Sequence, residues 1–162
     1  MEINVLIEQG LEEYLKASWL QGVAEQALIT RNTGSGLELG LVITGQEKVR
    51  QLNRSYLGKD EPTDVLSFSM LPEPLAGGES DSITPFVTPP DGVVHLGEVI
   101  ISYPQAVIQA GEHRHSIKRE VAVLIIHGVL HLLGYDHDKP ELEHRMKARE
   151  EEILSCIEGG LD

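Results

Sequence analysis

Three histidines within the eleven residues from His127 to His137, in the run HGVLHLLGYDH, restrict how this part of the chain can fold. His127 and His131 are four residues apart, so on a helix they differ by about 40° in direction and by one turn in height. In a continuous helix His137 would point away from both, so an ion shared by all three requires the chain to reverse. Gly134 permits this reversal, because glycine readily adopts the left-handed conformation that ends many helices. The spacing therefore predicts a helix that ends near Gly134 and a turn that brings back the third histidine.

The same three histidines form a candidate metal site. Three neutral imidazoles suit zinc, and a site with three protein ligands leaves a fourth position open for water or substrate, as is typical of catalytic zinc. Structural zinc sites usually close all four positions and usually include cysteine, which this run lacks. We therefore predict a metal-dependent hydrolase with one Zn²⁺ per chain, bound by His127, His131 and His137.

The spacing of this triad matches the zinc-protease motif HExxHxxGxxH except at one position. Position 128 is glycine, where that motif has the glutamate that acts as general base. This disfavours peptide hydrolysis, although zinc can lower the pKa of a bound water to about 7 without that glutamate. Asp136, next to the third ligand, is a candidate general base, and its alternative role is that of a solvated aspartate in a turn.

The other four histidines give a weaker signal. His95 falls in a predicted loop, His113 and His115 flank a predicted helix boundary, and His144 falls in the charged final helix. We predict that each is an ordinary surface side chain with no contact to the metal site.

Periodic apolar residues predict an α+β fold. Alternating and β-rich segments indicate strands at residues 3–7, 37–44, 63–70 and 97–103. Apolar residues at helical spacing indicate helices over residues 11–30, from 46, over 104–113, over 117–133 and after 140. We predict a single domain over residues 1–162, with a mixed sheet of about four strands packed with helices and the metal-binding helix and turn in the C-terminal half.

Two segments are expected to be exposed to solvent. Residues 71–95 hold five prolines and a GGESDS stretch, a composition that excludes a central strand or a regular helix, so we predict a surface loop. In the final helix the acidic residues between Glu141 and Glu158 are expected to form a solvated face. Its predicted N-cap is Asp138. Its predicted buried stripe comprises Leu142, Met146, Ile153 and Ile157.

Charge and patterning limit the partners and the location. A formal net charge of -13 argues against a protein that binds nucleic acid over its whole surface, since phosphate binding depends on cationic residues. Any nucleic-acid contact should be local, as at Arg50 and Arg54, which share one helix stripe. The first ten residues lack the basic region of a secretory signal, and the longest apolar run, Val121 to Ile126, has six residues. We therefore expect a cytoplasmic protein without a membrane segment.

Three blocks of the sequence resemble the YbeY endoribonuclease family, bacterial metalloproteins of ribosomal RNA maturation. The first block is the run from His127 to His137. The second comprises Leu52-Asn53, Gly58-Lys59-Asp60 and PTDVLSF at 62–68, and the third is LGEVIIS at 96–102. These blocks follow the family's order through the middle and C-terminal parts of the chain, whereas the N-terminal third resembles the family only in length and predicted elements.

This resemblance implies an α+β fold with a zinc-binding histidine triad. It also implies single-strand-specific RNA cleavage in small-subunit ribosomal RNA maturation and ribosome quality control, with ribosomal particles and assembly factors as partners. One position departs from the family pattern: members commonly carry an arginine that is thought to engage substrate phosphate, and this chain has Leu57 there, after Tyr56. Arg54 or Lys59 is then the expected substitute.

The leading hypothesis is hydrolysis of RNA phosphodiester bonds. Zinc would activate water or polarise a phosphoryl oxygen, while Arg50, Arg54 and Lys59 neutralise backbone charge. Ser67 is a further candidate for hydrogen bonding to phosphate, with strand packing as its alternative role. Two other hypotheses keep the zinc: a ribosome-assembly module with little catalysis, which the negative charge favours, and a peptidase or amidase, which the spacing favours and Gly128 opposes.

Overall fold

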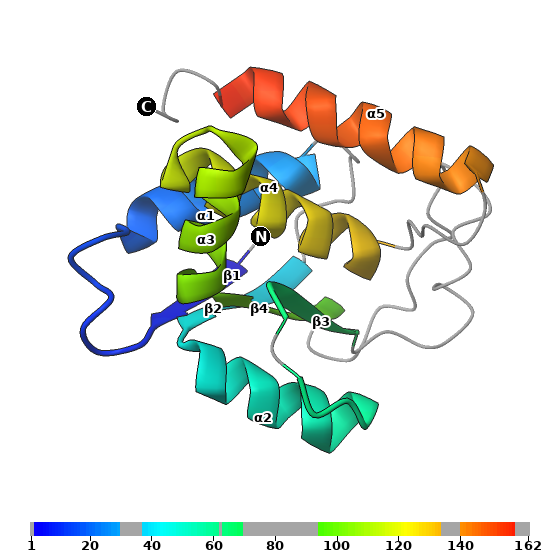
Figure 1. Cartoon of the computed structure of the whole chain (residues 1–162). Coiled ribbons are helices and arrows are strands. Elements are labelled where there is room, and N and C mark those ends of the chain that lie inside the picture. Colours follow the sequence, from blue (N-terminus) through cyan, green and yellow to red (C-terminus); the bar gives the residue numbers. More distant parts are fainter. Residues whose placement is uncertain (1, 30–36, 62, 70–93, 134–139, 158–162) are drawn as a thin grey trace.

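The computed structural model describes residues 2–29, 37–61, 63–69, 94–133 and 140–157 of the chain. Four strands and five helices follow one another in this part of the sequence (Figure 1). In chain order they are β1 (Glu2–Ile7), α1 (Ala17–Ile29), β2 (Leu37–Thr44), α2 (Gln46–Leu57), β3 (Val65–Ser69), β4 (Val94–Ser102), α3 (Tyr103–His113), α4 (Ile117–Leu132) and α5 (Pro140–Ile157). The predicted α+β class is confirmed, whereas the extent of the domain over residues 1–162 stays a prediction.

The four strands form one mixed sheet in the order β1-β2-β4-β3. β1 pairs with β2 and β2 with β4 in parallel, while β3 runs antiparallel to β4. Parallel neighbours require a crossover connection, and α1 lies in the connection between β1 and β2. β3 is a short edge strand, in which Ser67 is paired with Val99 of β4. The mixed four-stranded sheet is therefore as predicted.

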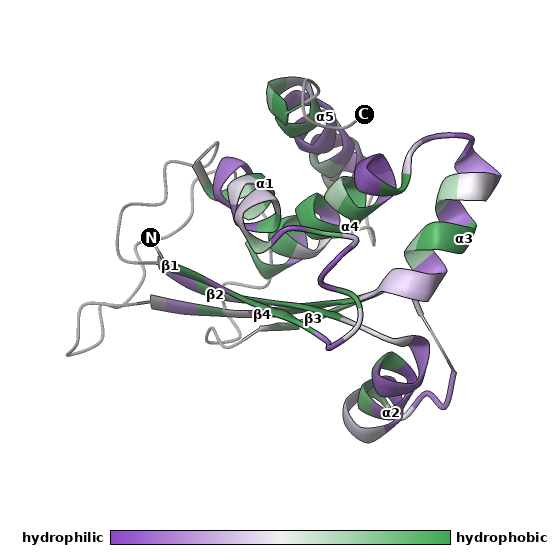
Figure 2. Ribbon diagram, turned by 90° about the vertical axis from the view of Figure 1, so that its left-hand side faces the viewer, coloured by the Kyte–Doolittle hydropathy of each residue, from purple (hydrophilic) through white to green (hydrophobic). Residues whose placement is uncertain are grey.

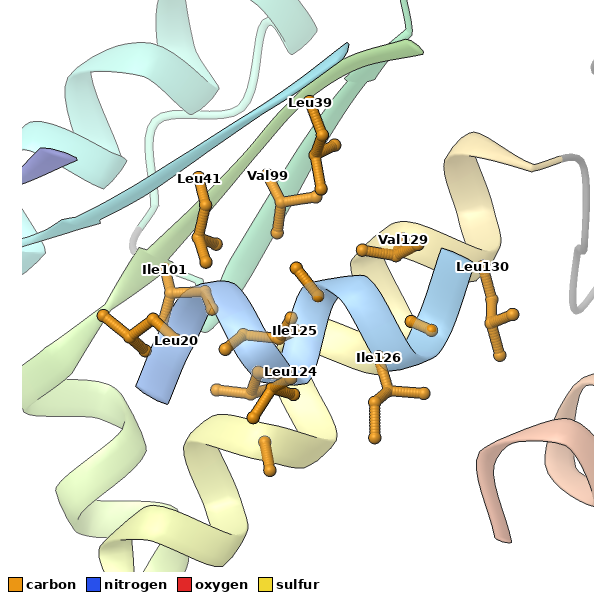
Figure 3. Packing of buried hydrophobic residues seen from close by; sticks show 14 of the residues in the cluster. Leu20, Leu39, Leu41, Val99, Ile101, Leu124, Ile125, Ile126, Val129 and Leu130 are labelled. Carbon is orange, nitrogen blue, oxygen red and sulfur yellow. The ribbon is translucent and has the colours of Figure 1, made fainter. Parts of the chain in front are cut away.

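Helices cover both faces of the sheet (Figure 2). α1 and α4 lie on one face, with α5 packed against both, and α2 lies on the opposite face. Figure 3 shows Leu41, Val99 and Ile101 pointing from the sheet into the principal core that α1 and α4 complete. A smaller cluster, which contains Val49 of α2 and Ile100 of β4, joins α2 to the other face. Because each fully buried aliphatic side chain contributes about 1.5–3 kcal/mol, this packing holds α4 firmly against the sheet.

α4 carries two of the three predicted zinc ligands. It begins after Ser116, whose side chain accepts a hydrogen bond from the backbone N–H of Arg119 and so caps the helix. It ends at Leu132, within one residue of the predicted end, and the predicted turn at Gly134 lies outside the described residues. No helix in the described part of the chain is long and apolar enough to cross a membrane.

α1 begins later than predicted. Four-residue spacing indicated a helix from about residue 11, but the first helical residue is Ala17. The preceding residues form turns, in one of which Leu11 donates its N–H to the carbonyl oxygen of Glu8. Leu15, in the same region, is only 2% exposed. The apolar spacing therefore predicted α1 correctly over Ala17–Ile29 and predicted helix incorrectly for the turns before it.

β4 begins earlier than predicted and shortens the predicted loop. The strand starts at Val94, so the last two positions of residues 71–95 belong to β4. His95 is thus a strand residue rather than a loop residue, and its Nδ1 lies 2.8 Å from Oε1 of Glu38 on β2. Pairing with β2 extends the strand because it satisfies backbone groups that would otherwise need water. Residues 71–93 lie outside the described residues.

Candidate functional site

Two of the three predicted zinc ligands face each other on α4. The Nε2 atoms of His127 and His131 are 3.2 Å apart, and the two rings meet edge to face with their centroids 4.7 Å apart. Both residues are partly exposed, although most of α4 around them is buried. The third predicted ligand, His137, and the candidate base Asp136 lie outside the described residues, as does the predicted cap Asp138. Their roles stay predictions.

The separation of the two nitrogens fits a shared zinc ion. Zinc binds imidazole nitrogen at about 2.0–2.1 Å with tetrahedral geometry, which places two such nitrogens roughly 3.4 Å apart. The observed 3.2 Å between the Nε2 atoms of His127 and His131 is close to that value. Imidazole is also a donor that zinc prefers. The histidine pair on α4 thus has the spacing and the chemistry for zinc.

A carboxylate on α5 orients His127. Oε1 of Glu150 lies 3.0 Å from Nδ1 of His127, and the side chains are 21% and 28% exposed, respectively. A carboxylate accepts the Nδ1 proton, which leaves the lone pair of a neutral His127 on Nε2, the atom that faces His131. Glu150 is thus a positioning residue for a candidate ligand, like the carboxylates that commonly support metal-bound histidine.

The sequence interpretation missed Glu150, because it placed the acidic residues of the final helix on a solvated face. Glu150 lies four residues after Met146 and three before Ile153, both of which are buried. The predicted apolar stripe has a gap at that position, and this helix packs against α4. An acidic residue at helical spacing between buried apolar residues was the sequence signal that Glu150 faces α4 and not solvent.

Gly128 lets α4 approach the sheet closely beside His127. A Cβ atom at position 128 would lie 2.6 Å from Cγ1 of Val99 and 3.2 Å from Oγ of Ser67. Val99 and Ser67 are paired across β4 and β3, so together they form the surface on which Gly128 rests. Ser67 also donates a hydrogen bond from Oγ to the carbonyl oxygen of Gly128, 3.3 Å away. Close packing therefore requires glycine at the position where zinc proteases have glutamate.

Replacing Gly128 with alanine is expected to lower the free energy of unfolding by about 1–3 kcal/mol. Val99 is fully buried, and a β-branched side chain has few alternative rotamers, so the added methyl group must push α4 away from the sheet. Chemical denaturation of the purified Gly128→Ala variant measures the loss.

Gly22→Ala is the matched control for this prediction. Gly22 also lies within a helix, α1, but a Cβ atom there would meet nothing within 4 Å. The control is expected to gain up to about 1 kcal/mol, because alanine has the higher helix propensity. A similar gain in Gly128→Ala would contradict the close contact with Val99.

The predicted phosphate-binding residues Arg50, Arg54 and Lys59 lie on α2 and just after it. α2 and α4 lie on opposite faces of the sheet, so the structure places these residues across the sheet from His127 (Figure 2). Arg50 forms an ion pair in which its Nε lies 2.9 Å from Oδ1 of Asp60 and its Nη2 lies 3.3 Å from Oδ2. This hydrogen-bonded carboxylate raises the pKa of Arg50. Arg54 and Lys59 are exposed.

The edge strand β3 lies between the histidines and the basic helix. Ser67 faces α4, and it already donates its hydroxyl proton to the helix backbone. Its neighbour Phe68 faces α2, where its ring centroid is 5.1 Å from that of Tyr56. Leu57 is 55% exposed on the same helix. A ligand that contacts both the histidines and the basic residues must therefore pass around the edge formed by β3.

A second group of side chains that could bind a metal ion lies near the start of α4. His113, His115 and Glu120 each bring one ligand atom within 4.8 Å of the others. Both histidines contact the buried carboxylate of Glu120, which the expectation of ordinary surface side chains did not include, although His113 itself is exposed as expected. His144 is exposed on α5, as expected of a surface residue.

Comparisons with known proteins identify the family. The sequence matches the family model Endoribonuclease YbeY over residues 4–158. An Endoribonuclease YbeY of Dehalococcoides mccartyi is 49% identical over 160 residues, which cover 97% of this chain and 97% of the relative. A protein of the same name from Roseiflexus sp. is 41% identical over 156 residues, with 96% and 92% covered.

A solved structure supports the same fold. The solution structure of a Thermotoga maritima protein is similar with a TM-score of 0.58 and 22% sequence identity, over 97% of this chain and 92% of that one. At this identity the likeness concerns the fold alone. The family model, in contrast, spans nearly the whole chain, and the relatives align with this chain over nearly their full lengths. The chain therefore belongs to the YbeY endoribonuclease family.

Proposed function

We propose that this chain is a zinc-dependent endoribonuclease that cleaves single-stranded RNA in small-subunit ribosomal RNA maturation and ribosome quality control. The observation that carries the proposal is the facing pair of Nε2 atoms on His127 and His131, 3.2 Å apart, with Glu150 on the other nitrogen of His127. The family supports RNA as the substrate, because the relatives bear the name endoribonuclease. The proposed location is the cytoplasm, and the proposed partners are ribosomal particles and assembly factors.

The proposed zinc ligands are His127, His131 and His137, which hold one ion per chain at this triad. When bound, zinc in a three-histidine site supplies Lewis acidity and a water of lowered pKa. His127 and His131 present their Nε2 atoms to each other, and Glu150 holds His127 in the tautomer that can serve as ligand. Asp136 is the proposed general base.

The proposed RNA contacts extend around the edge of the sheet. Arg54 and Lys59 are exposed on the α2 side and are the proposed phosphate contacts, whereas the charge of Arg50 is partly neutralised by Asp60. Tyr56, which is 69% exposed near these cations, offers a ring on which a base can stack. On the α4 side Ser67 can donate to a phosphate only after releasing the Gly128 carbonyl, so its main proposed role is to support α4.

A zinc-containing ribosome-assembly module with little catalysis is the second candidate. The net charge of -13 and the exposed Leu57 favour it, because both weaken the attraction for RNA phosphate. A peptidase or amidase has less support, since close packing requires Gly128 at the position of the protease glutamate.

RNA cleavage and zinc content, measured together, test the proposed function. We expect the wild-type protein to cut single-stranded RNA and His131→Ala to lose both cleavage and the zinc bound by the triad. His144→Ala is the matched control, because this exposed histidine lies outside the site, and the variant should keep both properties. Cleavage that persists in His131→Ala would overturn the zinc mechanism, and zinc without cleavage in the wild type would favour the assembly module.

A further inference from the structure

A buried carboxylate near the start of α4 holds two histidines. The side chain of Glu120 lies in the first turn of α4 and is 3% exposed. Its Oε1 lies 2.8 Å from Nδ1 of His113 and 2.6 Å from Nε2 of His115. His113 is the last residue of α3 and is 54% exposed, whereas His115 lies between the two helices and is 23% exposed. The group therefore joins the end of α3 to the start of α4 at the protein surface.

The backbone between the helices brings the two imidazoles together. Arg114, between them, adopts φ 57° and ψ 42°, the left-handed conformation that ends α3. The next N–H, that of His115, donates to the carbonyl oxygen of Ala110, and Ser116 then caps α4. Across this turn the two rings lie with their centroids 5.5 Å apart. The fold itself thus holds both histidines against Glu120.

We infer that His113, His115 and Glu120 form a second metal site, which takes a divalent transition-metal ion such as zinc. Two imidazole nitrogens and one carboxylate oxygen are a donor set found in three-ligand zinc sites. The exposed side of His113 leaves a further coordination position to water. The group lies seven residues, or about 10 Å along the helix, before His127, so it is separate from the proposed catalytic site.

The observed distances are those of hydrogen bonds, which bonds to a metal ion would replace. Ligand atoms of a tetrahedral zinc ion lie roughly 3.3 Å apart, about 0.5 to 0.7 Å more than these hydrogen bonds of 2.8 and 2.6 Å. Both imidazole rings, which are more exposed than Glu120, must move outward by this amount while Glu120 stays in place. The hydrogen bond to Glu120 raises the pKa of His113.

An ion at the second site would anchor the helix that carries the catalytic histidines. Its ligands come from both ends of the α3–α4 connection, and Glu120 and His127 belong to the same helix. An ion that binds only the folded state also stabilises it by mass action. The expected effect of an ion at the second site is therefore to stabilise the α3–α4 connection.

Metal titration in the absence of the proposed catalytic site tests this inference. The starting variant carries His127→Ala, His131→Ala and His137→Ala. Titration with Co²⁺ alone, followed by its visible ligand-field absorption, is expected to show one ion bound per chain and displaced by Zn²⁺. Adding His113→Ala is expected to weaken this binding at least about 10-fold, because even the outer-shell partners of metal ligands contribute that much. Adding His144→Ala instead should leave the affinity unchanged.

The second site is overturned if the starting variant binds no Co²⁺, or if His113→Ala leaves the binding unchanged. The three side chains would then only form hydrogen bonds that connect α3 to α4. If the starting variant does not fold, NMR of the wild-type protein decides. A second equivalent of Zn²⁺ is expected to shift the ring signals of His113 and His115, and unchanged signals overturn the inference. Failure of the second site can be distinguished from failure of the proposed endoribonuclease function. The latter is measured by RNA cleavage in the wild type and in His131→Ala, which these titrations do not measure.

Discussion

Replacing Glu150 with glutamine is expected to weaken zinc binding at the proposed catalytic site by about 10- to 100-fold. The carboxylate lies 3.0 Å from Nδ1 of His127 and so favours the tautomer whose Nε2 binds the metal. Glutamine keeps the shape but removes the charge, which makes Nε2 a weaker donor. RNA cleavage at limiting zinc is expected to fall in parallel. Competition with a chelating dye measures the affinity, and nitrogen NMR of the His127 ring reports the tautomer.

Glu151→Gln is the matched control for this prediction. Glu151 is the next residue of α5, and it is exposed, so the variant carries the same charge change away from His127. Zinc affinity and the His127 tautomer are expected to stay as in the wild type. Equal weakening in both variants would mean that overall charge controls the affinity and that Glu150 has no positioning role.

The helix that carries His127 and His131 could be predicted because its determinants are local. The four-residue spacing of His127 and His131, and the apolar run before them, are properties of a single helix, and α4 ends within one residue of the prediction. The strands likewise follow from short-range alternation, as in β2, whose bounds Leu37–Thr44 are those predicted. Periodicity failed before α1, where the buried Leu15 and the partly buried Leu11 lie in turns that precede the helix.

The side chains that support the candidate site could not be predicted in this way, because they come from distant segments. Glu150 and His127 are 23 positions apart, and Ser67 and Gly128 are 61 positions apart. Neither contact follows from a repeat along the chain, since each depends on the order of strands and on how α4 and α5 pack. The histidines of the second site are nearer to their carboxylate, but their convergence depends on the left-handed turn at Arg114.

The Gly97→Ala substitution is expected to prevent stable folding, with a loss of more than about 4 kcal/mol. A Cβ atom on Gly97 would overlap the carbonyl oxygen of Phe68 on β3 and lie 3.0 Å from the carbonyl carbon. These are backbone atoms, so relief requires β3 to separate from β4, and Gly97 also has a φ of 138° that side chains rarely adopt. Separation would withdraw Ser67 from α4. Circular dichroism and denaturant titration measure the loss.

Gly58→Ala distinguishes backbone strain from atomic overlap in this prediction. Gly58 follows α2 with a φ of 71°, but a Cβ atom there would meet nothing within 4 Å. This variant is expected to lose only the cost of the left-handed backbone, about 1–2 kcal/mol. If Gly97→Ala loses no more than that, the β3–β4 pairing adapts to a side chain and the contact between Ser67 and α4 does not depend on Gly97. A loss several times larger means that the edge strand beside the histidines is held in place only while position 97 has no side chain.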